Sequence, residues 1–170
     1  MSATRASLPE VVFALPGEWV RADFRDDRQV AELTDLMDGV AADDPVAWIA
    51  GTTAVGGVLM MFRIRSEPPV ALLFAWPPGE EDGDASMSGL RGRLGVDGAP
   101  VDHAAGYACV RERSQSGADG ADVLTYGLVH PDSGRLLVVR FTAFGAPFDE
   151  IDLDDYDLSV GHMRWEEPDA

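Results

Sequence analysis

The densest group of reactive side chains in this sequence is an acidic run near its C-terminal end. The run holds six carboxylates in nine residues and no basic residue: Asp149, Glu150, Asp152, Asp154, Asp155 and Asp157. Carboxylate oxygens are ligands for calcium, but the D-x-D-x-D-G loop with a distal glutamate is absent from the sequence. Carboxylates also stabilise the positive N-terminal end of a helix. The run therefore favours a helix start on a solvated surface first, a partner-binding surface second, and a metal site last.

The other reactive side chains are one cysteine and three histidines. Nucleophilic catalysis needs a cysteine or serine beside a base, but Cys109 falls in a predicted strand, where a free thiol usually behaves as a small buried hydrophobic group. His103, His130 and His162 are widely separated, and none has a second histidine or cysteine at zinc-ligand spacing. His130 precedes a proline at a turn and His162 lies in the predicted last helix, so we expect both on the surface. The sequence predicts no catalytic residue, no metal site and no cofactor.

The charge of the chain limits its partners. All 13 basic residues are arginines and 30 residues are acidic, so the formal net charge is −17. Nucleic-acid binding uses clustered basic side chains, whereas here they occur at most in pairs such as Arg111 and Arg113. A phosphate-binding loop would lack its lysine. We therefore expect neither nucleic acid nor an anionic membrane as a partner. The negative field would attract a basic protein, although it also serves solubility.

Length and composition indicate one globular domain. The chain has 170 residues, of which 46% are hydrophobic and 25% charged, as in ordinary folded domains. We expect a single domain over residues 1–170 with flexible ends at 1–10 and 166–170. One cysteine excludes an internal disulfide and suits a reducing compartment, and no stretch approaches the roughly 18 apolar residues that span a bilayer. These features predict a cytoplasmic protein.

Hydrophobic periodicity predicts the helices that would position these residues. An opening strand or hairpin around 11–20 is followed by an amphipathic helix, which should end near Asp43-Asp44-Pro45 because the residue before proline disfavours helical geometry. Residues 46–58 give a mixed pattern, and residues 77–100 predict a loop with one or two helical turns. From Pro147 onward, apolar residues at steps of three and four predict a last helix that packs on a sheet, although alternation there leaves a strand possible.

Five apolar segments predict strands. They are Val58 to Ile64, Val70 to Trp76, Ala104 to Arg111, Asp122 to Val129 and Arg135 to Phe144. The first two form one hairpin, and turn residues at 131–134 join the last two into another. A polar loop is expected at 115–120. Because several strands are apolar on both faces, the sheet should be covered on both sides.

Three segments give a resemblance to a known family. They are the opening Leu15-Pro16-Gly17-Glu18-Trp19, the strand RLLVVRFTAF and the closing YDLSVGHMRW. With the order of elements, they resemble the PsbP-like α/β sandwich, also called the Mog type. The resemblance implies an α+β fold with an antiparallel β-sheet covered by helices on both faces. It also implies a bias towards protein binding, without a shared active site that could be carried over.

These observations lead to three functional hypotheses. The first is a non-catalytic protein-binding or accessory module, of immunity or secretion-accessory type, whose acidic run docks another protein of basic character. The second is an enzyme or small-molecule binder that uses a pocket between sheet and helix, recognisable as an apolar cavity with two or more convergent polar groups. The third is a structural subunit of a larger assembly, recognisable by a large flat apolar surface.

Overall fold

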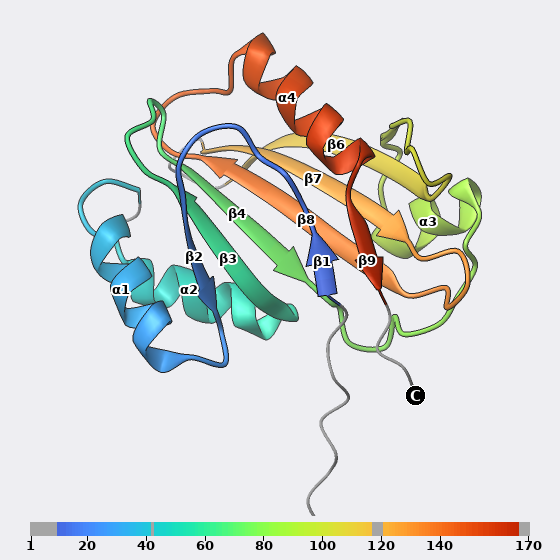
Figure 1. Ribbon diagram of the computed structural model, residues 1–170, viewed down its shortest axis with the longest axis horizontal. Coiled ribbons are helices and arrows are strands. Elements are labelled where there is room, and N and C mark those ends of the chain that lie inside the picture. Colours follow the sequence, from blue (N-terminus) through green and yellow to red (C-terminus); the bar gives the residue numbers. More distant parts are fainter. Residues whose placement is uncertain (1–9, 42, 117–120, 167–170) are drawn as a thin grey trace, which may run out of the picture.

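The computed structural model describes residues 10–41, 43–116 and 121–166, and the centre of this part of the chain is a seven-stranded antiparallel sheet (Figure 1). Its strands lie in the order β2 (Trp19–Asp23), β3 (Gly57–Arg63), β4 (Val70–Ala75), β8 (Leu136–Ala143), β7 (Ala121–Val129), β6 (Ala108–Ser116) and β5 (Ala99–Pro100). Within the described residues there are four helices: α1 (Asp27–Met37), α2 (Pro45–Ala54), α3 (Met87–Leu94) and α4 (Glu150–Gly161). The α+β class predicted from the sequence is confirmed.

A second, two-stranded sheet brings the two ends of the described chain together. β1 (Glu10–Val12) pairs antiparallel with β9 (Arg164–Glu166) and not with β2, so of the predicted opening strand or hairpin the hairpin alternative is wrong. Glu10 and Glu166, which the sequence assigned to flexible ends, are opposite each other in this pairing. The rest of those predicted ends, residues 1–9 and 167–170, lies outside the described residues.

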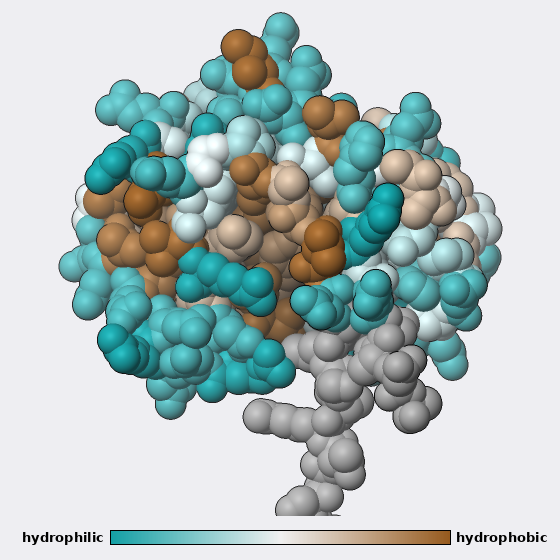
Figure 2. All heavy atoms as spheres, viewed as in Figure 1, coloured by the Kyte–Doolittle hydropathy of each residue, from teal (hydrophilic) through white to brown (hydrophobic). Residues whose placement is uncertain are grey.

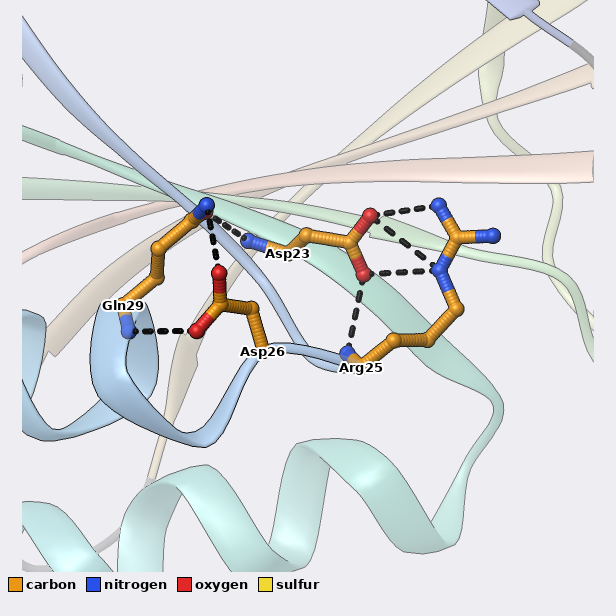
Figure 3. A network of polar contacts seen from close by, with 4 residues as sticks. All are labelled: Asp23, Arg25, Asp26 and Gln29. Atoms are coloured by element: carbon orange, nitrogen blue, oxygen red, sulfur yellow. Dashed lines mark hydrogen bonds and ion pairs between the residues drawn. The ribbon is translucent and has the colours of Figure 1, made fainter.

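The corner between β2 and α1 is fixed by a local polar network (Figure 3). Asp26 caps the helix by accepting hydrogen bonds from the backbone N–H groups of Arg28 and Gln29. The Gln29 amide oxygen accepts from the backbone N–H of Asp23 at 3.0 Å, and Arg25 pairs with the Asp23 carboxylate at 2.5 Å. The hydrogen bonds from Arg25 lower the pKa of Asp23 to about 2. The capping aspartate predicted from the sequence is therefore confirmed.

The first helix is shorter than predicted, and the acidic residues after it start a second one. α1 ends at Met37, two residues before Gly39, which has a positive φ of 67°. The expected end near Asp43-Asp44-Pro45 is wrong, because Asp44 caps α2 by accepting from the backbone N–H of Ala47 and Pro45 is the first residue of that helix. Proline suits this position, since it needs no hydrogen-bond donor there.

The predicted hairpins are confirmed and one predicted strand is displaced. β7 and β8 pair from Asp122 opposite Ala143 to Val129 opposite Leu136, and β3 pairs antiparallel with β4. The strand expected at Ala104 to Arg111 instead runs as β6 from Ala108 to Ser116, because a turn at His103 to Gly106 precedes it. Its last two residues, Gln115 and Ser116, were predicted as part of a loop. Residues 117–120 of that loop lie outside the described part of the chain.

The buried side chains form two apolar clusters, and alternate residues of the same strands belong to different clusters. The Tyr156 cluster combines residues such as Leu72 and Phe141 of the sheet with Tyr156 and Val160 of α4. The Leu33 cluster combines residues such as Leu73 of the sheet with Leu33 of α1, Ile49 of α2 and Leu90 of α3. Successive residues of a strand point to opposite faces, so neighbours such as Leu72 and Leu73 contribute to different clusters.

Candidate functional site

A cavity of about 730 Å³ opens over the middle strands of the sheet, on the side of the Leu33 cluster. Helices α1 and α2 contact the sheet at β2 and β3, and α3 contacts it at β6 and β7. The floor between these contacts is formed by β4, β8, β7 and β6. A volume of this size is within the range of small-molecule sites, which run from about 300 to 1,000 Å³.

Part of the cavity wall is formed by apolar side chains of α2 and α3. Trp48 of α2 packs edge-on against Phe144 at a ring separation of 5.6 Å, and Leu94 of α3 lines the opposite part. α3 lies close to the sheet because Gly127 has no side chain, and a Cβ built there would overlap Leu94. The described lining therefore provides an apolar surface for the body of a ligand.

Strand register places a row of polar side chains on the cavity floor. Glu112 of β6 is opposite Thr125 of β7, which is opposite Arg140 of β8. All three line the cavity, and so does Thr142, two residues after Arg140 in β8. Residues two apart in a strand share a face. The floor thus carries a polar line across three strands, and Thr142 adds a hydroxyl group in the neighbouring row.

Arg140 is the most unusual residue of this row. Its Nε atom is buried and has no hydrogen-bond partner among the described residues. By contrast, four other arginines among the described residues each pair with a carboxylate: Arg63, Arg93, Arg111 and Arg113. A buried donor without an acceptor costs free energy, and such groups are rare in folded proteins. Arg140 therefore offers an unmatched cationic donor to whatever occupies the cavity.

Sequence reasoning missed the cavity residues Glu112, Thr125 and Arg140. The only local signal is Arg140 itself, a charged residue inside the otherwise apolar segment 136–144. Such a residue indicates that one position of the strand faces something other than packed hydrophobic groups. The partners of Arg140 on the floor could not be found in the same way, because only the strand pairing brings them together.

The acidic run predicted as a partner-binding surface is divided by the structure. Asp149 caps α4 by accepting from the backbone N–H of Asp152 at 2.7 Å. The Asp152 side chain pairs with Arg63 at 3.1 Å. Asp157 pairs with Arg111 and accepts a hydrogen bond of 2.6 Å from the Tyr126 hydroxyl. Half of the run therefore starts the helix or ties it to the sheet.

The other half of the run consists of Glu150, Asp154 and Asp155. Their side chains make no hydrogen bond or ion pair with another described residue. Asp154 and Asp155 lie on α4 between Ile151 and Leu158, whose side chains are 72% and 63% exposed. Residues three and four apart share one face of a helix. Figure 2 shows hydrophobic groups interrupting the hydrophilic surface along α4. This outer face of α4, defined by residues 151, 154, 155 and 158, is the second candidate surface.

Burial governs the other titratable groups predicted from the sequence. Cys109 is fully buried, as expected, and burial raises the pKa of its thiol to about 12. Burial also raises the pKa of Tyr156 to about 12. The pKa of Tyr126 is raised as well, mainly by burial and in addition by its hydrogen bond to Asp157. These groups are protonated at neutral pH and belong to the packed interior.

The histidine predictions are partly wrong. His162 is exposed at the end of α4, as expected. His130 is buried, however, because its ring packs against Tyr107 at 5.7 Å and Trp165 at 5.1 Å. His103 stacks on the same Tyr107 ring at 4.3 Å. The turn after His130 directs its side chain inward against Tyr107 and Trp165, which belong to the Tyr156 cluster.

Among the described residues, no group of three or more histidine, cysteine, aspartate or glutamate side chains is arranged to hold a metal ion. The same residues contain no helix with the length and apolar composition needed to cross a membrane.

Comparison of the chain with protein-family models, with curated proteins and with solved structures gave no match. The resemblance to the PsbP-like family therefore stays a prediction. The function of this chain has to be argued from its own cavity and its own surface.

Proposed function

We propose that this protein binds a small molecule with an anionic group and an apolar body in the cavity over β4, β8, β7 and β6. The observation that carries the proposal is the buried Nε of Arg140, which has no partner in the described residues and lines the cavity. Of the three functional hypotheses, only the small-molecule binder predicts an apolar cavity with convergent polar groups. As predicted from the sequence, the proposed activity is binding without catalysis.

A carboxylate suits Arg140 better than a phosphate does. A guanidinium presents its N–H groups in a planar fork that matches the two oxygens of one carboxylate. A phosphate would bring more negative charge, and the cavity lining offers a single arginine and the carboxylates of Glu112 and Asp43. The aromatic edge of Trp48 and the side chain of Leu94 suit an aliphatic or aromatic body on the ligand.

The proposal includes the layered arrangement predicted from the sequence, a sheet with helices on both faces as in a PsbP-like sandwich. The separation of buried residues into the Tyr156 and Leu33 clusters supports it, since α4 contributes to the first and α1, α2 and α3 to the second. In this arrangement the cavity is a gap in one helical layer. The sheet itself would be the rigid base of the site.

The test is a titration with small carboxylates. Hexanoate, phenylpropionate, leucine and phenylalanine are each added to the protein, with the primary amides of the same acids as counterparts that lack the carboxylate charge, and Kd is measured by isothermal titration calorimetry. We expect one or more of the acids to bind and its amide to bind at least about tenfold more weakly, since charge-assisted hydrogen bonds are the stronger ones.

Arg140→Gln identifies the site in this titration. The variant keeps a hydrogen-bond donor and loses the charge, so we expect it to lose the binding of the acids. The matched control is Arg164→Gln, which removes the same charge from an exposed position on β9. Equal binding of acids and amides, or acid binding that Arg140→Gln leaves unchanged, would contradict the proposal.

We propose, as a second function, that the outer face of α4 docks a basic protein. Asp154 and Asp155 carry charge that no described residue neutralises, and the exposed Ile151 and Leu158 beside them add apolar contact area. Charge complementarity with a net charge of −17 favours a basic partner. Of the acidic run that the sequence predicted as a partner-binding surface, this proposal keeps Asp154 and Asp155.

The double variant Asp154→Asn with Asp155→Asn tests this surface and leaves the ion pairs of Asp152 and Asp157 in place. The wild-type protein should retain a basic partner from the native cell at low salt and release it at about 0.5 M salt, where screening is strong. The double variant should fail to retain it at either concentration. Retention of the same partner by both proteins at low salt would exclude the outer face of α4.

A further inference from the structure

The cavity floor carries a negative side chain as well as a positive one. Glu112 lines the same cavity as Arg140, and Thr125 lies between them in the row across β6, β7 and β8. The two charged residues are two strands apart, which places their Cα atoms about 10 Å from each other. They form no ion pair with each other or with another described residue. A cation and an anion therefore face the same cavity separately.

This arrangement is unfavourable for a ligand that is only an anion. Such a ligand would be attracted by Arg140, but repelled by Glu112 and by the net charge of −17. A ligand that is only a cation would be attracted by Glu112, by Asp43 and by the net charge, but it would leave the buried Nε of Arg140 without an acceptor. A ligand with one charge of each sign meets a partner at both ends and has no net charge for the protein field to act on.

The polar row also has the right chemistry between its charged ends. Thr125 lies between Glu112 and Arg140 in the register, and its hydroxyl group is able to donate to a carboxylate or accept from an ammonium group. The apolar part of a ligand would then extend from the row along one of the two apolar parts of the lining, either at Trp48 or at Leu94. Arg140, Glu112 and an apolar part of the lining are all contacted by a molecule that carries an ammonium group and a carboxylate close together and an apolar side chain beside them.

We propose that the ligand of this cavity is an amino acid with an apolar side chain, bound with its carboxylate on Arg140 and its ammonium group on Glu112. This inference rests on the proposed small-molecule function and names its ligand class. Arg140 is the anchor for the carboxylate, and Glu112 determines the preference for an amino group over a plain carboxylic acid.

Three probes of the same shape separate these contributions. Phenylalanine carries both charges, phenylpropionate lacks the amino group, and phenethylamine lacks the carboxylate. Their Kd values are measured by isothermal titration calorimetry on the full chain and on Glu112→Gln and Arg140→Gln. Glu150→Gln is the control, because it removes the same charge as Glu112→Gln from an exposed position on α4. Melting temperatures of all four proteins establish that the variants are folded.

We expect the wild-type protein to bind phenylalanine at least about tenfold more tightly than either of the other probes, which corresponds to one charged contact. Glu112→Gln should lose the preference for phenylalanine over phenylpropionate, and Arg140→Gln should lose the binding of both acids. The control Glu150→Gln should match the wild type.

The two proposals fail in different ways. If phenylpropionate binds as tightly as phenylalanine, or if Glu112→Gln keeps the preference, the amino-acid inference is wrong, while loss of binding in Arg140→Gln still supports a carboxylate site. If Arg140→Gln binds every acid as the wild type does, or no acid binds to either protein, the cavity is not the proposed site and both proposals fall.

Discussion

The two sides of the central sheet are built differently, although the same strands contribute to both. On the side of the Tyr156 cluster, aromatic rings fill the space above the strands: Tyr156 stacks on Phe141 at 4.0 Å and meets Phe148 at 5.7 Å. On the side of the Leu33 cluster, the ring pair of Trp48 and Phe144 borders an open cavity. The Tyr156 side is therefore closed by aromatic packing above the strands, whereas the Leu33 side leaves room for polar groups beside its apolar cluster.

Polar groups follow the same division. On the Tyr156 side, Asp122, Asp152 and Asp157 are each bound to an arginine of the sheet. On the cavity side, Glu112 and Arg140 are left without such partners in the described residues. Glu112 and Arg140 are therefore a place where a ligand can supply the partner that each of the two charges lacks.

The largest expected difference between the two sides is in thiol reactivity. Cys109 on the packed side is fully buried with a pKa of about 12, whereas a cysteine introduced by Thr125→Cys would lie in the cavity beside Arg140. Labelling of the introduced thiol by iodoacetamide should be faster by on the order of a thousandfold or more, because Cys109 reacts only after unfolding. Mass spectrometry of the labelled chain measures both rates. Rapid labelling of the wild-type protein would refute the packed character of that side.

The next difference is in stability. Tyr156→Ala removes a fully buried ring from the packed side and should lower the free energy of unfolding by about 3–5 kcal/mol. Thr125→Ala on the cavity floor removes a half-buried side chain from an open space and should change it by about 0.5 kcal/mol or less. Urea denaturation followed by circular dichroism measures both. Similar losses in the two variants would mean that the cavity side is as tightly packed as the other.

A third difference concerns pH. The buried Asp122 accepts two hydrogen bonds from Arg113 and one of 3.0 Å from the backbone N–H of Phe148. Burial by itself raises the pKa of Asp122, but these hydrogen bonds outweigh it and hold the pKa below its ordinary value. A carboxylate with a lowered pKa in the folded state stabilises the protein above its unfolded pKa of about 4, and this stability is lost as the pH falls through the folded value.

Asp122→Asn tests this contribution. At pH 7 the variant should lose about 2 kcal/mol of unfolding free energy, because the charged hydrogen bonds to Arg113 and Phe148 are weakened. Below about pH 4 the difference in unfolding free energy between the variant and the wild type should become smaller. Urea denaturation at several pH values measures this difference. Arg164→Gln is the control for the loss of a surface charge. A gap that is the same at every pH would show that Asp122 contributes through packing rather than charge.

The smallest effect is expected on the outer face of α4. Ile151→Ser and Leu158→Ser replace side chains that are 72% and 63% exposed, so each should change the free energy of unfolding by about 0.5 kcal/mol or less. The comparison with Tyr156→Ala, on the inner face of the same helix, makes the result specific. A loss of about 2 kcal/mol or more would mean that another part of the chain or a second copy covers this face.

Much of the fold could be predicted from the sequence where apolar runs are bounded by turn residues. Such runs form β3, β4, β7 and β8. Apolar residues that recur every three or four positions predicted α1 and α4. α2 could not be predicted, because Gly51, Thr52 and Thr53 are poor helix formers. The helix is held by its cap at Asp44 and by the burial of Ile49 in the Leu33 cluster.

The cavity could not be predicted for a different reason. Glu112, Thr125 and Arg140 are each more than ten residues from the next, and nothing in their local sequence relates them. Their proximity depends on the register of β6, β7 and β8, which a shift of one residue would destroy by turning each side chain to the other face. The polar half of β6 was also not predicted as strand, because its alternate side chains face the cavity and not a packed core.

The distribution of tryptophan over the two sides has a practical consequence for optical experiments. Trp19, Trp76 and Trp165 all belong to the Tyr156 cluster, and Trp48 is the fourth tryptophan of the chain and borders the cavity. Replacing the first three by phenylalanine would leave a single indole emitter beside the site. Its emission would respond to the polarity of that one location, so the molecule contains its own fluorescent reporter of cavity occupancy.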